Sequence, residues 1–164
     1  MKFQIAAAAL ALAAGTAVGG GAAQAATDYV TVPLEVTVNA PADVAWKKIS
    51  GFCDIGGWMK TTCEITSGKA DEVGAVRRIA GRVDEVQVAR TAWSYSYAQP
   101  KSPIDYHGTV EIRPDGKGKS KLLYTLVYDA AALPAGRDKA TDVAARTKQF
   151  TVVINTMKGI AEAK

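Results

Sequence analysis

The chain has few of the residues on which metal sites and common catalytic motifs depend. Its 164 residues include only one His and two Cys, which is too few for a conventional zinc site built from Cys and His ligands. The sequence also lacks a glycine-rich phosphate loop, a G-x-S-x-G nucleophile turn and an H-E-x-x-H metal motif. We therefore expect no metal and no cofactor, and we assign no catalytic residue.

A strong excess of one charge is also lacking. The 20 Lys and Arg residues nearly balance the 16 Asp and Glu residues, which gives a formal net charge of +4. The basic residues are scattered, and no basic helix or RNA-binding aromatic motif accompanies them, so we expect no nucleic-acid partner. The hydrophobic fraction of 48% excludes a wholly disordered chain, and the length favours one folded domain.

The N-terminal apolar run is too short to span a membrane. It covers about 14 residues from Ile5 to Val18, whereas a transmembrane helix needs roughly 20. Lys2 precedes this run and Ala23-Gln24-Ala25 follows it, which is the pattern of a secretory signal peptide. We predict that residues 1–25 are removed after Ala25 and that the protein is exported, to the bacterial periplasm, without a stable membrane anchor. The folded domain would then comprise residues 26–164, and an uncleaved N-terminal anchor is the alternative.

The two cysteines, Cys53 and Cys63, both lie in the part of the chain that would be exported. In an oxidising compartment two cysteines at this spacing are expected to form a disulfide. The closed loop would stabilise the fold by about 3 kcal/mol in the chain-entropy model. Two free or reactive thiols are the alternative, although the spacing is not that of a C-x-x-C redox motif.

The hydrophobic pattern changes along the domain from a period of two to helical spacing. Residues 30–38 alternate apolar and polar side chains, which predicts a strand, and Pro41 begins the first of two short helices after it. Residues 138–162 carry an apolar stripe at every third or fourth position, which predicts a long C-terminal helix. The stripe is Val143, Thr147, Phe150, Ile154, Met157 and Ala161. Six more strands are expected at residues 62–67, 73–80, 83–90, 92–99, 104–113 and 119–129. Because a sheet must bury its apolar face, we predict an α+β fold in which a curved antiparallel sheet of about seven strands wraps around the long helix.

Aromatic residues are few, at 7% of the chain, but tyrosines concentrate on the strand faces that would look toward this helix. A buried Tyr needs a partner for its hydroxyl, and a core without a ligand would more economically use Leu, Ile and Phe. We therefore predict a cavity with apolar walls and several polar points, as small-molecule sites have; a packed core is the alternative. The candidate ligand-binding residues from this pattern are Trp93, Tyr95, Tyr97, Tyr106, Tyr124, Tyr128, Phe150, Ile154 and Met157.

A series of motifs, taken in order, resembles a known superfamily. The motifs are Asn39-Ala40-Pro41-Ala42-Asp43-Val44-Ala45-Trp46, Gly51-Phe52-Cys53 followed by Trp58, Val73 to Arg78, Glu85-Val86, Tyr95 to Tyr97, and Tyr106 to Val110. In order and spacing they resemble the START-like (helix-grip) superfamily and, within it, the polyketide cyclase/dehydrase branch called SRPBCC, over residues 28–162. The resemblance implies a large cavity between sheet and helix that takes an apolar or amphipathic small molecule. Members include lipid carriers, hormone receptors and polyketide cyclases.

The resemblance also singles out Arg77 and Glu85. They match an Arg and a Glu that face the cavity in the hormone-receptor relatives, and on neighbouring antiparallel strands the two can pair. An outward, solvated pair is the alternative. The connection at residues 79–82 is shorter than the gating loop of those receptors. His107 alternates with Tyr106, so we expect it on the solvated face and give it no catalytic role.

These features favour an exported protein that binds a hydrophobic or amphipathic ligand, lipid-like or polyketide-like. One alternative is an enzyme of the polyketide cyclase or dehydratase type, which would use Arg77, Glu85 and the tyrosines to handle protons and enolate charge. A second alternative is an envelope interaction domain that binds no ligand. The sequence assigns neither the ligand nor an oligomeric state.

Overall fold

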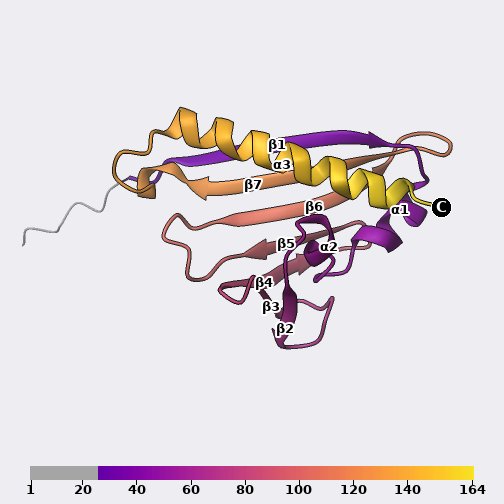
Figure 1. The fold of residues 1–164 in the computed structure, drawn as a ribbon, viewed down its shortest axis with the longest axis horizontal. Coiled ribbons are helices and arrows are strands. Elements are labelled where there is room, and N and C mark those ends of the chain that lie inside the picture. The colour runs from indigo at the N-terminus through magenta and orange to yellow at the C-terminus, as the bar shows by residue number, and fades with distance from the viewer. Residues whose placement is uncertain (1–25) are drawn as a thin grey trace, which may run out of the picture.

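The first and last strands of the chain lie side by side in one antiparallel sheet. The structure is a computed structural model that describes residues 26–164, so the predicted signal peptide lies outside the described residues. The sheet has seven strands in the order β1-β7-β6-β5-β4-β3-β2 (Figure 1). The strands are β1 (Tyr29–Val38), β2 (Cys63–Ser67), β3 (Val76–Ile79), β4 (Val83–Arg90), β5 (Ser94–Ala98), β6 (His107–Pro114) and β7 (Ser120–Asp129).

The helices carry the chain between the sheet edges and cover one face. β1 and β2 stand at opposite edges of the sheet, and the chain between them forms α1 (Ala42–Ile49) and α2 (Ile55–Trp58). After β7 a short 3-10 helix, η1 (Ala130–Ala132), leads to α3 (Lys139–Glu162), which lies along β1 and β7 (Figure 1). This confirms the predicted α+β helix-grip fold, with two short helices after the first strand and a sheet wrapped around the C-terminal helix.

Strand β7 shows why the alternating pattern leads to this architecture. Its inward side chains Leu122, Tyr124, Leu126 and Tyr128 are fully buried, whereas the residues between them are only partly buried. Successive side chains of a strand point to opposite faces, so one strand supplies an apolar surface to α3 and a more polar surface to solvent. The long helix is the element that covers the apolar surface.

Helix α3 matches its predicted limits but not all of its predicted inner face. It begins after Asp138, whose carboxylate accepts a hydrogen bond from the Thr141 backbone N–H at 2.9 Å, a typical N-cap. The buried side chains from its middle to its C-terminal end include Phe150, Ile154 and Met157, as predicted. The predicted stripe is wrong at Thr147, which is exposed; the buried residue in the first turns of α3 is Asp142.

The predicted disulfide is confirmed. Cys53 and Cys63 are bonded, with their Cα atoms 5.5 Å apart. The bond joins the chain just before α2 to the first residue of β2, so it fixes α2 against the edge of the sheet. A disulfide of this kind is compatible with export to an oxidising compartment.

Within residues 26–164, no helix is both long enough and apolar enough to cross a membrane.

Candidate functional site

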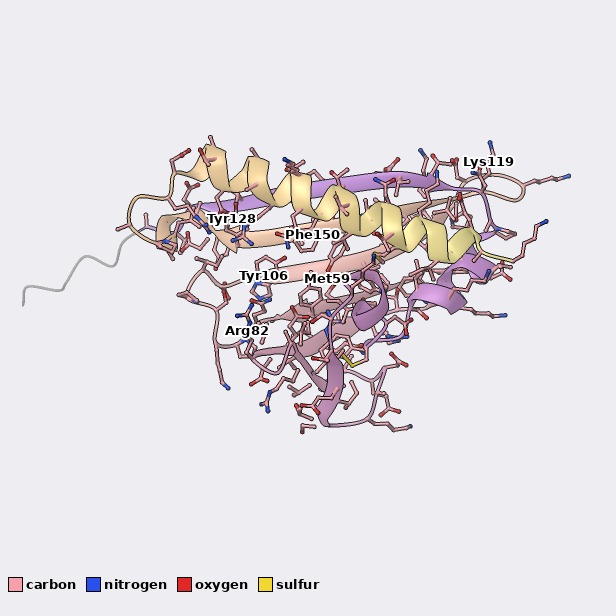
Figure 2. The ribbon with its side chains drawn as sticks, viewed as in Figure 1. Met59, Arg82, Tyr106, Lys119, Tyr128 and Phe150 are labelled. Atoms are coloured by element: carbon pink, nitrogen blue, oxygen red, sulfur yellow. A yellow bond between two sulfur atoms is a disulfide. The ribbon has the colours of Figure 1, made fainter. Side chains whose placement is uncertain are left out.

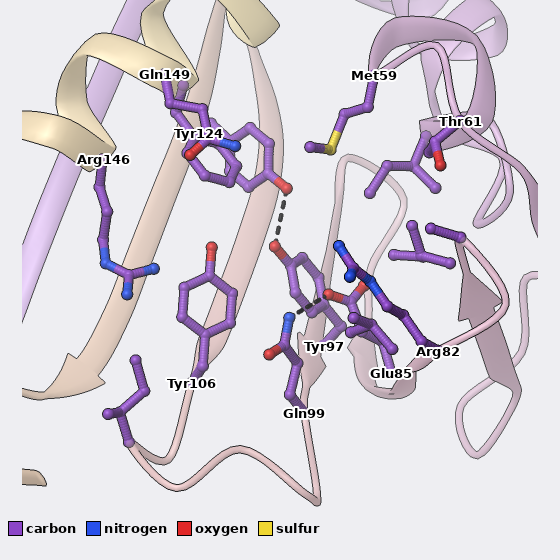
Figure 3. Close-up of a pocket in the computed structure, with 16 residues that line it drawn as sticks. Met59, Thr61, Arg82, Glu85, Tyr97, Gln99, Tyr106, Tyr124, Arg146 and Gln149 are labelled. Atoms are coloured by element: carbon purple, nitrogen blue, oxygen red, sulfur yellow. Dashed lines mark hydrogen bonds between the residues drawn. The ribbon is translucent and has the colours of Figure 1, made fainter. Parts of the chain in front are cut away.

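A pocket of about 400 Å³ opens between the first half of α3, the helix α2, the strands β3, β4, β5 and β7, and the segment just before β6. Figure 2 shows Met59, Phe150, Tyr106 and Arg82 gathered around this region, far from Lys119 in the β6–β7 turn. The volume falls in the lower part of the range of about 300–1,000 Å³ that small-molecule pockets occupy. The residues that line it are Ile55, Met59, Thr61, Ile79, Ala80, Arg82, Val83, Glu85, Tyr97, Gln99, Ile104, Tyr106, Tyr124, Arg146, Gln149 and Phe150 (Figure 3).

Two tyrosine hydroxyls meet at the centre of the pocket. The hydroxyls of Tyr97 on β5 and Tyr124 on β7 are 2.8 Å apart, and either can donate to the other (Figure 3). Their strands are separated by β6, where Gly108 lies opposite Tyr97 in the register. A Cβ at position 108 would lie only 2.3 Å from the Tyr97 hydroxyl, so the missing side chain of Gly108 makes room for the Tyr97 ring. Because each hydroxyl can donate once and accept, the pair keeps one donor for a ligand.

A buried ion pair forms the wall beside these tyrosines. Arg77 on β3 lies opposite Glu85 on β4, and its Nε and Nη2 atoms are 2.7 and 2.5 Å from Glu85 Oε2. The other carboxylate oxygen, Oε1, accepts a hydrogen bond of 2.9 Å from Gln99 Nε2. Glu85 and Gln99 line the pocket, whereas Arg77 stands behind Glu85 and does not.

Arg77 is also held by groups other than Glu85. Its Nη1 donates to the backbone carbonyl of Phe52, and its guanidinium lies over the Phe52 ring at 4.2 Å and near the Tyr97 ring at 4.9 Å. Burial alone would lower the pKa of Arg77, but the adjacent Tyr95 and Glu85 raise it above its usual value. Arg77 therefore stays charged, and its role in the wall is to hold the Glu85 carboxylate in place.

A second arginine–carboxylate pair borders the pocket on α3. Arg146 Nε donates to Asp142 Oδ2 at 2.5 Å, one helical turn earlier. The Arg146 guanidinium lies over the Tyr128 ring at 4.3 Å and near the Tyr106 ring at 5.4 Å. Burial works to raise the pKa of the Asp142 carboxyl, yet the hydrogen bond from Arg146 and the positive charges of Arg146 and Arg137 hold it below its ordinary value.

The tyrosines of the pocket are neutral hydrogen-bond donors. Burial raises the pKa values of Tyr97, Tyr106 and Tyr124 above the ordinary value for the phenol group. Burial likewise raises the pKa of Tyr95 to about 12, against the lowering influence of Arg77. At neutral pH the pocket tyrosines Tyr97, Tyr106 and Tyr124 therefore offer O–H donors to a ligand rather than negative charge.

Comparison with known proteins assigns the family. A family model described as polyketide cyclase/dehydrase and lipid transport matches residues 29–153. The chain belongs to this family. The match covers every strand and most of α3, including all the pocket residues described above. A comparison with curated proteins gives no match.

Solved structures share the fold of this polyketide cyclase/dehydrase family member at low sequence identity. The Zhui aromatase/cyclase from Streptomyces sp. R1128 is 21% identical, with a TM-score of 0.63 over 82% of this chain and 94% of that one. A START superfamily protein from Mycobacterium smegmatis is 14% identical, with a TM-score of 0.66 over 80% of this chain and 97% of that one. A protein from Nitrosospira multiformis is 16% identical, with a TM-score of 0.64 over 79% and 94% of the two chains. At these identities the likeness concerns the fold.

The structure brings about half of the predicted site residues of this family member to the pocket. Five of them line it, namely Glu85, Tyr97, Tyr106, Tyr124 and Phe150. Five others are buried on the same side of the sheet but pack in the core or in the wall behind the pocket, namely Arg77, Tyr95, Tyr128, Ile154 and Met157. The orientation of Arg77 and Glu85 is therefore inward, which excludes the solvated pair.

The prediction that Trp93 faces inward with Tyr95 and Tyr97 is wrong. Trp93 precedes β5 and is 37% exposed. The chain turns there, because the Thr91 N–H donates to the Ser94 carbonyl at 2.8 Å and the Trp93 N–H donates to the Thr91 hydroxyl at 3.1 Å. Strand alternation does not extend through a turn, so parity with Tyr95 does not place the Trp93 ring.

Sequence reasoning missed the polar residues of the pocket, above all Arg82, Gln99, Arg146 and Gln149. One signal was present for Arg146, which precedes Phe150 by four residues and so shares its helix face. A second signal was Gly108, which points to the tyrosine pair, since a glycine inside a strand marks the close approach of another group, here the Tyr97 ring. Gln99 follows β5, and Arg82 is the last residue of the β3–β4 turn. The period-two alternation of strands does not extend to these positions.

His107 lies outside the pocket. The His107 side chain on β6 is 38% exposed, and its Nδ1 is 2.8 Å from the Asp105 carbonyl oxygen. His107 does not line the pocket. Among residues 26–164, no group of three or more His, Cys, Asp or Glu side chains is arranged to hold a metal ion.

Proposed function

We propose that this family member is an exported protein that binds a small amphipathic molecule in the pocket between α2, α3 and the sheet. The observation that carries the proposal is the tyrosine pair. Two buried hydroxyls, Tyr97 and Tyr124, bond to each other at the surface of a cavity of about 400 Å³ whose other walls are largely aliphatic and aromatic. A ligand with an apolar body and a few oxygen atoms fits such a surface.

The contacts of the ion pair support binding more than catalysis. A cyclase or dehydratase of the type considered above would need Arg77, Glu85 or a tyrosine to exchange protons with the substrate. Arg77 is fully buried and engaged by Glu85 and Phe52, and burial keeps the Tyr97 and Tyr124 phenols protonated by raising their pKa values. Among these groups only Glu85 combines a charge with a position on the pocket surface.

Binding is tested with the neutral probe 2-naphthaleneethanol, measured by calorimetry, and with native mass spectrometry of the purified protein. We expect the probe to bind to the wild-type protein and to be excluded by Met59→Trp, because Met59 points into the pocket (Figure 3). The matched control is Val44→Trp, which adds the same ring on the exposed face of α1. A protein that carries no co-purified molecule and binds the probe equally with and without Met59→Trp would contradict the proposal.

Export is tested separately by expression of the full chain in a Gram-negative host. We expect the protein in the periplasmic fraction, with a mass that corresponds to a first residue at Ala26. A protein that retains residues 1–25 in the membrane fraction would support the uncleaved anchor instead.

The alternative activity has its own test. A cyclase-type enzyme would convert a reactive polyketide-like chain, and Glu85→Gln would abolish that conversion because Glu85 is the charged carboxylate on the pocket surface. Wild-type protein that alters no such substrate, or a Glu85→Gln variant with unchanged turnover, would favour the binding protein.

A further inference from the structure

The pocket carries more positive than negative charge on its surface. Three charged side chains line it, namely Arg82, Arg146 and Glu85. The Glu85 carboxylate is matched by Arg77, whose Nη2 is 2.5 Å from Glu85 Oε2, so that pair is neutral as a unit. The two charges that remain on the lining are both guanidinium groups.

The charge of Arg146 is only partly compensated. Its partner Asp142 is buried and also faces Arg137, whose Nη1 is 3.3 Å from Asp142 Oδ1. One carboxylate thus faces two guanidinium groups, and the cluster keeps a charge of one unit. Arg146 uses its Nε for Asp142, which leaves its Nη atoms on the side of the Tyr106 ring and the pocket.

Arg82 has no partner at all among residues 26–164. It makes no ion pair and no side-chain hydrogen bond in the described part of the chain, although it lines the pocket. The nearby carboxylate of Asp84 is held by Arg78 at 2.7 Å and by Lys101 at 2.8 Å. Arg82 is therefore a charged donor on the pocket lining that is bonded to no acceptor in the described part of the chain.

The backbone before Arg82 is fixed, which keeps this donor at the pocket. Ala80 and Gly81 have φ values of 50° and 69°, as the two central residues of a type I′ turn require. The Ala80 N–H donates to the Thr62 carbonyl at 3.0 Å, which ties the turn to the residue before β2. Figure 3 shows Arg82 and Arg146 on opposite sides of the pocket, with Tyr106 and the Tyr97–Tyr124 pair between them.

We propose that the pocket selects an amphipathic anion, an aryl or alkyl carboxylate whose carboxylate is bound by Arg82, with Arg146 adding attraction from the opposite side. This inference rests on the proposed binding function and names the class of its ligand. The planar guanidinium donates two parallel hydrogen bonds to a carboxylate. The apolar body would lie against the walls formed by Met59, Ile104 and Phe150.

The charge preference is measured with three probes that share one ring system. Calorimetry compares 2-naphthaleneacetate, 2-naphthaleneethanol and 2-naphthaleneethylamine, which carry a negative, a neutral and a positive group. We expect the carboxylate to bind about tenfold more tightly than the alcohol, because a charge-assisted hydrogen bond replaces a neutral one, and the amine to bind most weakly. Raising the salt concentration should reduce the preference for the carboxylate and leave the alcohol unaffected.

Arg82→Gln tests whether Arg82 is the source of the preference. Because Arg82 is exposed and makes no ion pair, we expect this variant to keep its thermal midpoint. It should lose most of the tenfold preference for the carboxylate. The matched control is Lys47→Gln, which makes the same change in net charge at an exposed position on α1 that does not line the pocket, and which should keep the preference. Arg146→Lys, with its positive charge retained, should also keep most of it.

The outcomes separate this inference from the proposed function. If the alcohol and the carboxylate bind the wild-type protein equally, or if Arg82→Gln and Lys47→Gln behave alike, the anion preference is overturned while binding stands. If none of the three probes binds, both proposals are overturned.

Discussion

The two halves of α3 lie on the same sheet but serve different purposes. The second half buries Val153, Met157 and Ala161 in a continuous apolar core. The first half presents Arg146 and Gln149 to the pocket, with Asp142 buried behind them. We call these the core half, residues 151–162, and the pocket half, residues 139–150.

The contrast between the two halves of α3 shows which part of this fold stabilises it and which part leaves room for a ligand. In the core half, apolar side chains fill the space between helix and sheet, which is the main source of folding free energy. In the pocket half, longer polar side chains pair with one another, and space remains between the helix and the strands β3, β4, β5 and β7. Changes in the two halves should therefore have different effects on stability and on binding.

The largest expected effect is in the core half. Met157→Ala removes a fully buried side chain and should lower the free energy of unfolding by about 3 kcal/mol, because it loses apolar burial and leaves a cavity. The affinity of the folded protein for 2-naphthaleneethanol should not change, since Met157 does not line the pocket. Urea denaturation measures the loss, and Val152→Ala on the exposed face of the same helix should change it by less than about 0.5 kcal/mol. Equal effects of the two substitutions would contradict the proposed division of α3.

An intermediate effect is expected in the pocket half, and it should depend on pH. Asp142→Asn removes the carboxylate that Arg146 and Arg137 share and should cost about 2 kcal/mol of stability at neutral pH. Because the pKa of Asp142 is lowered in the folded protein, the carboxylate stabilises the fold above the unfolded-state pKa of about 4. That contribution is lost as the pH falls through the lower folded-state pKa.

Denaturation of wild-type protein and Asp142→Asn between pH 7 and pH 2 tests this dependence. The difference between the two proteins should be constant above about pH 5 and should shrink below about pH 4. Asp43→Asn, at an exposed position in the first turn of α1, serves as the control and should change stability by less than about 0.5 kcal/mol. A difference that grows toward acid pH would refute the assignment.

The smallest expected effect on stability comes from the tyrosine pair. Tyr97→Phe removes one of two buried hydroxyls that bond to each other and should cost about 1 kcal/mol. It should also weaken binding of 2-naphthaleneethanol, because the pair supplies a donor at the pocket surface. Tyr29→Phe, at a half-exposed position on β1, should leave the binding unchanged. A Tyr97→Phe variant with wild-type affinity would remove the tyrosine pair from the ligand site.

Much of the fold could be predicted because it depends on local periodicity. The alternation in β7 and the helical spacing from Phe150 to Met157 both follow from the burial of one face. The disulfide followed from the compartment and from the spacing of Cys53 and Cys63. The same reasoning failed at Trp93, where a turn interrupts the strand and the alternation with it.

The pocket was less predictable because its polar residues follow no period. Arg82, Gln99 and Gln149 come from a turn, from the end of a strand and from a helix, and only the folded chain brings them together. Patterns of burial also could not separate a Tyr that lines the cavity from one that packs in the core. Tyr124 and Tyr128 lie on the same strand face and are equally buried, yet only Tyr124 reaches the pocket.

The sequence by itself determined that an apolar sheet face with many tyrosines would be covered by one long helix, because the hydrophobic pattern repeats with the period of each element. Only the tertiary structure shows where α3 leaves part of this sheet face uncovered. The pocket exists where α2, the β3–β4 turn and the polar half of α3 meet around the tyrosine pair. The positions of these three segments depend on long-range packing and on the disulfide rather than on any local pattern.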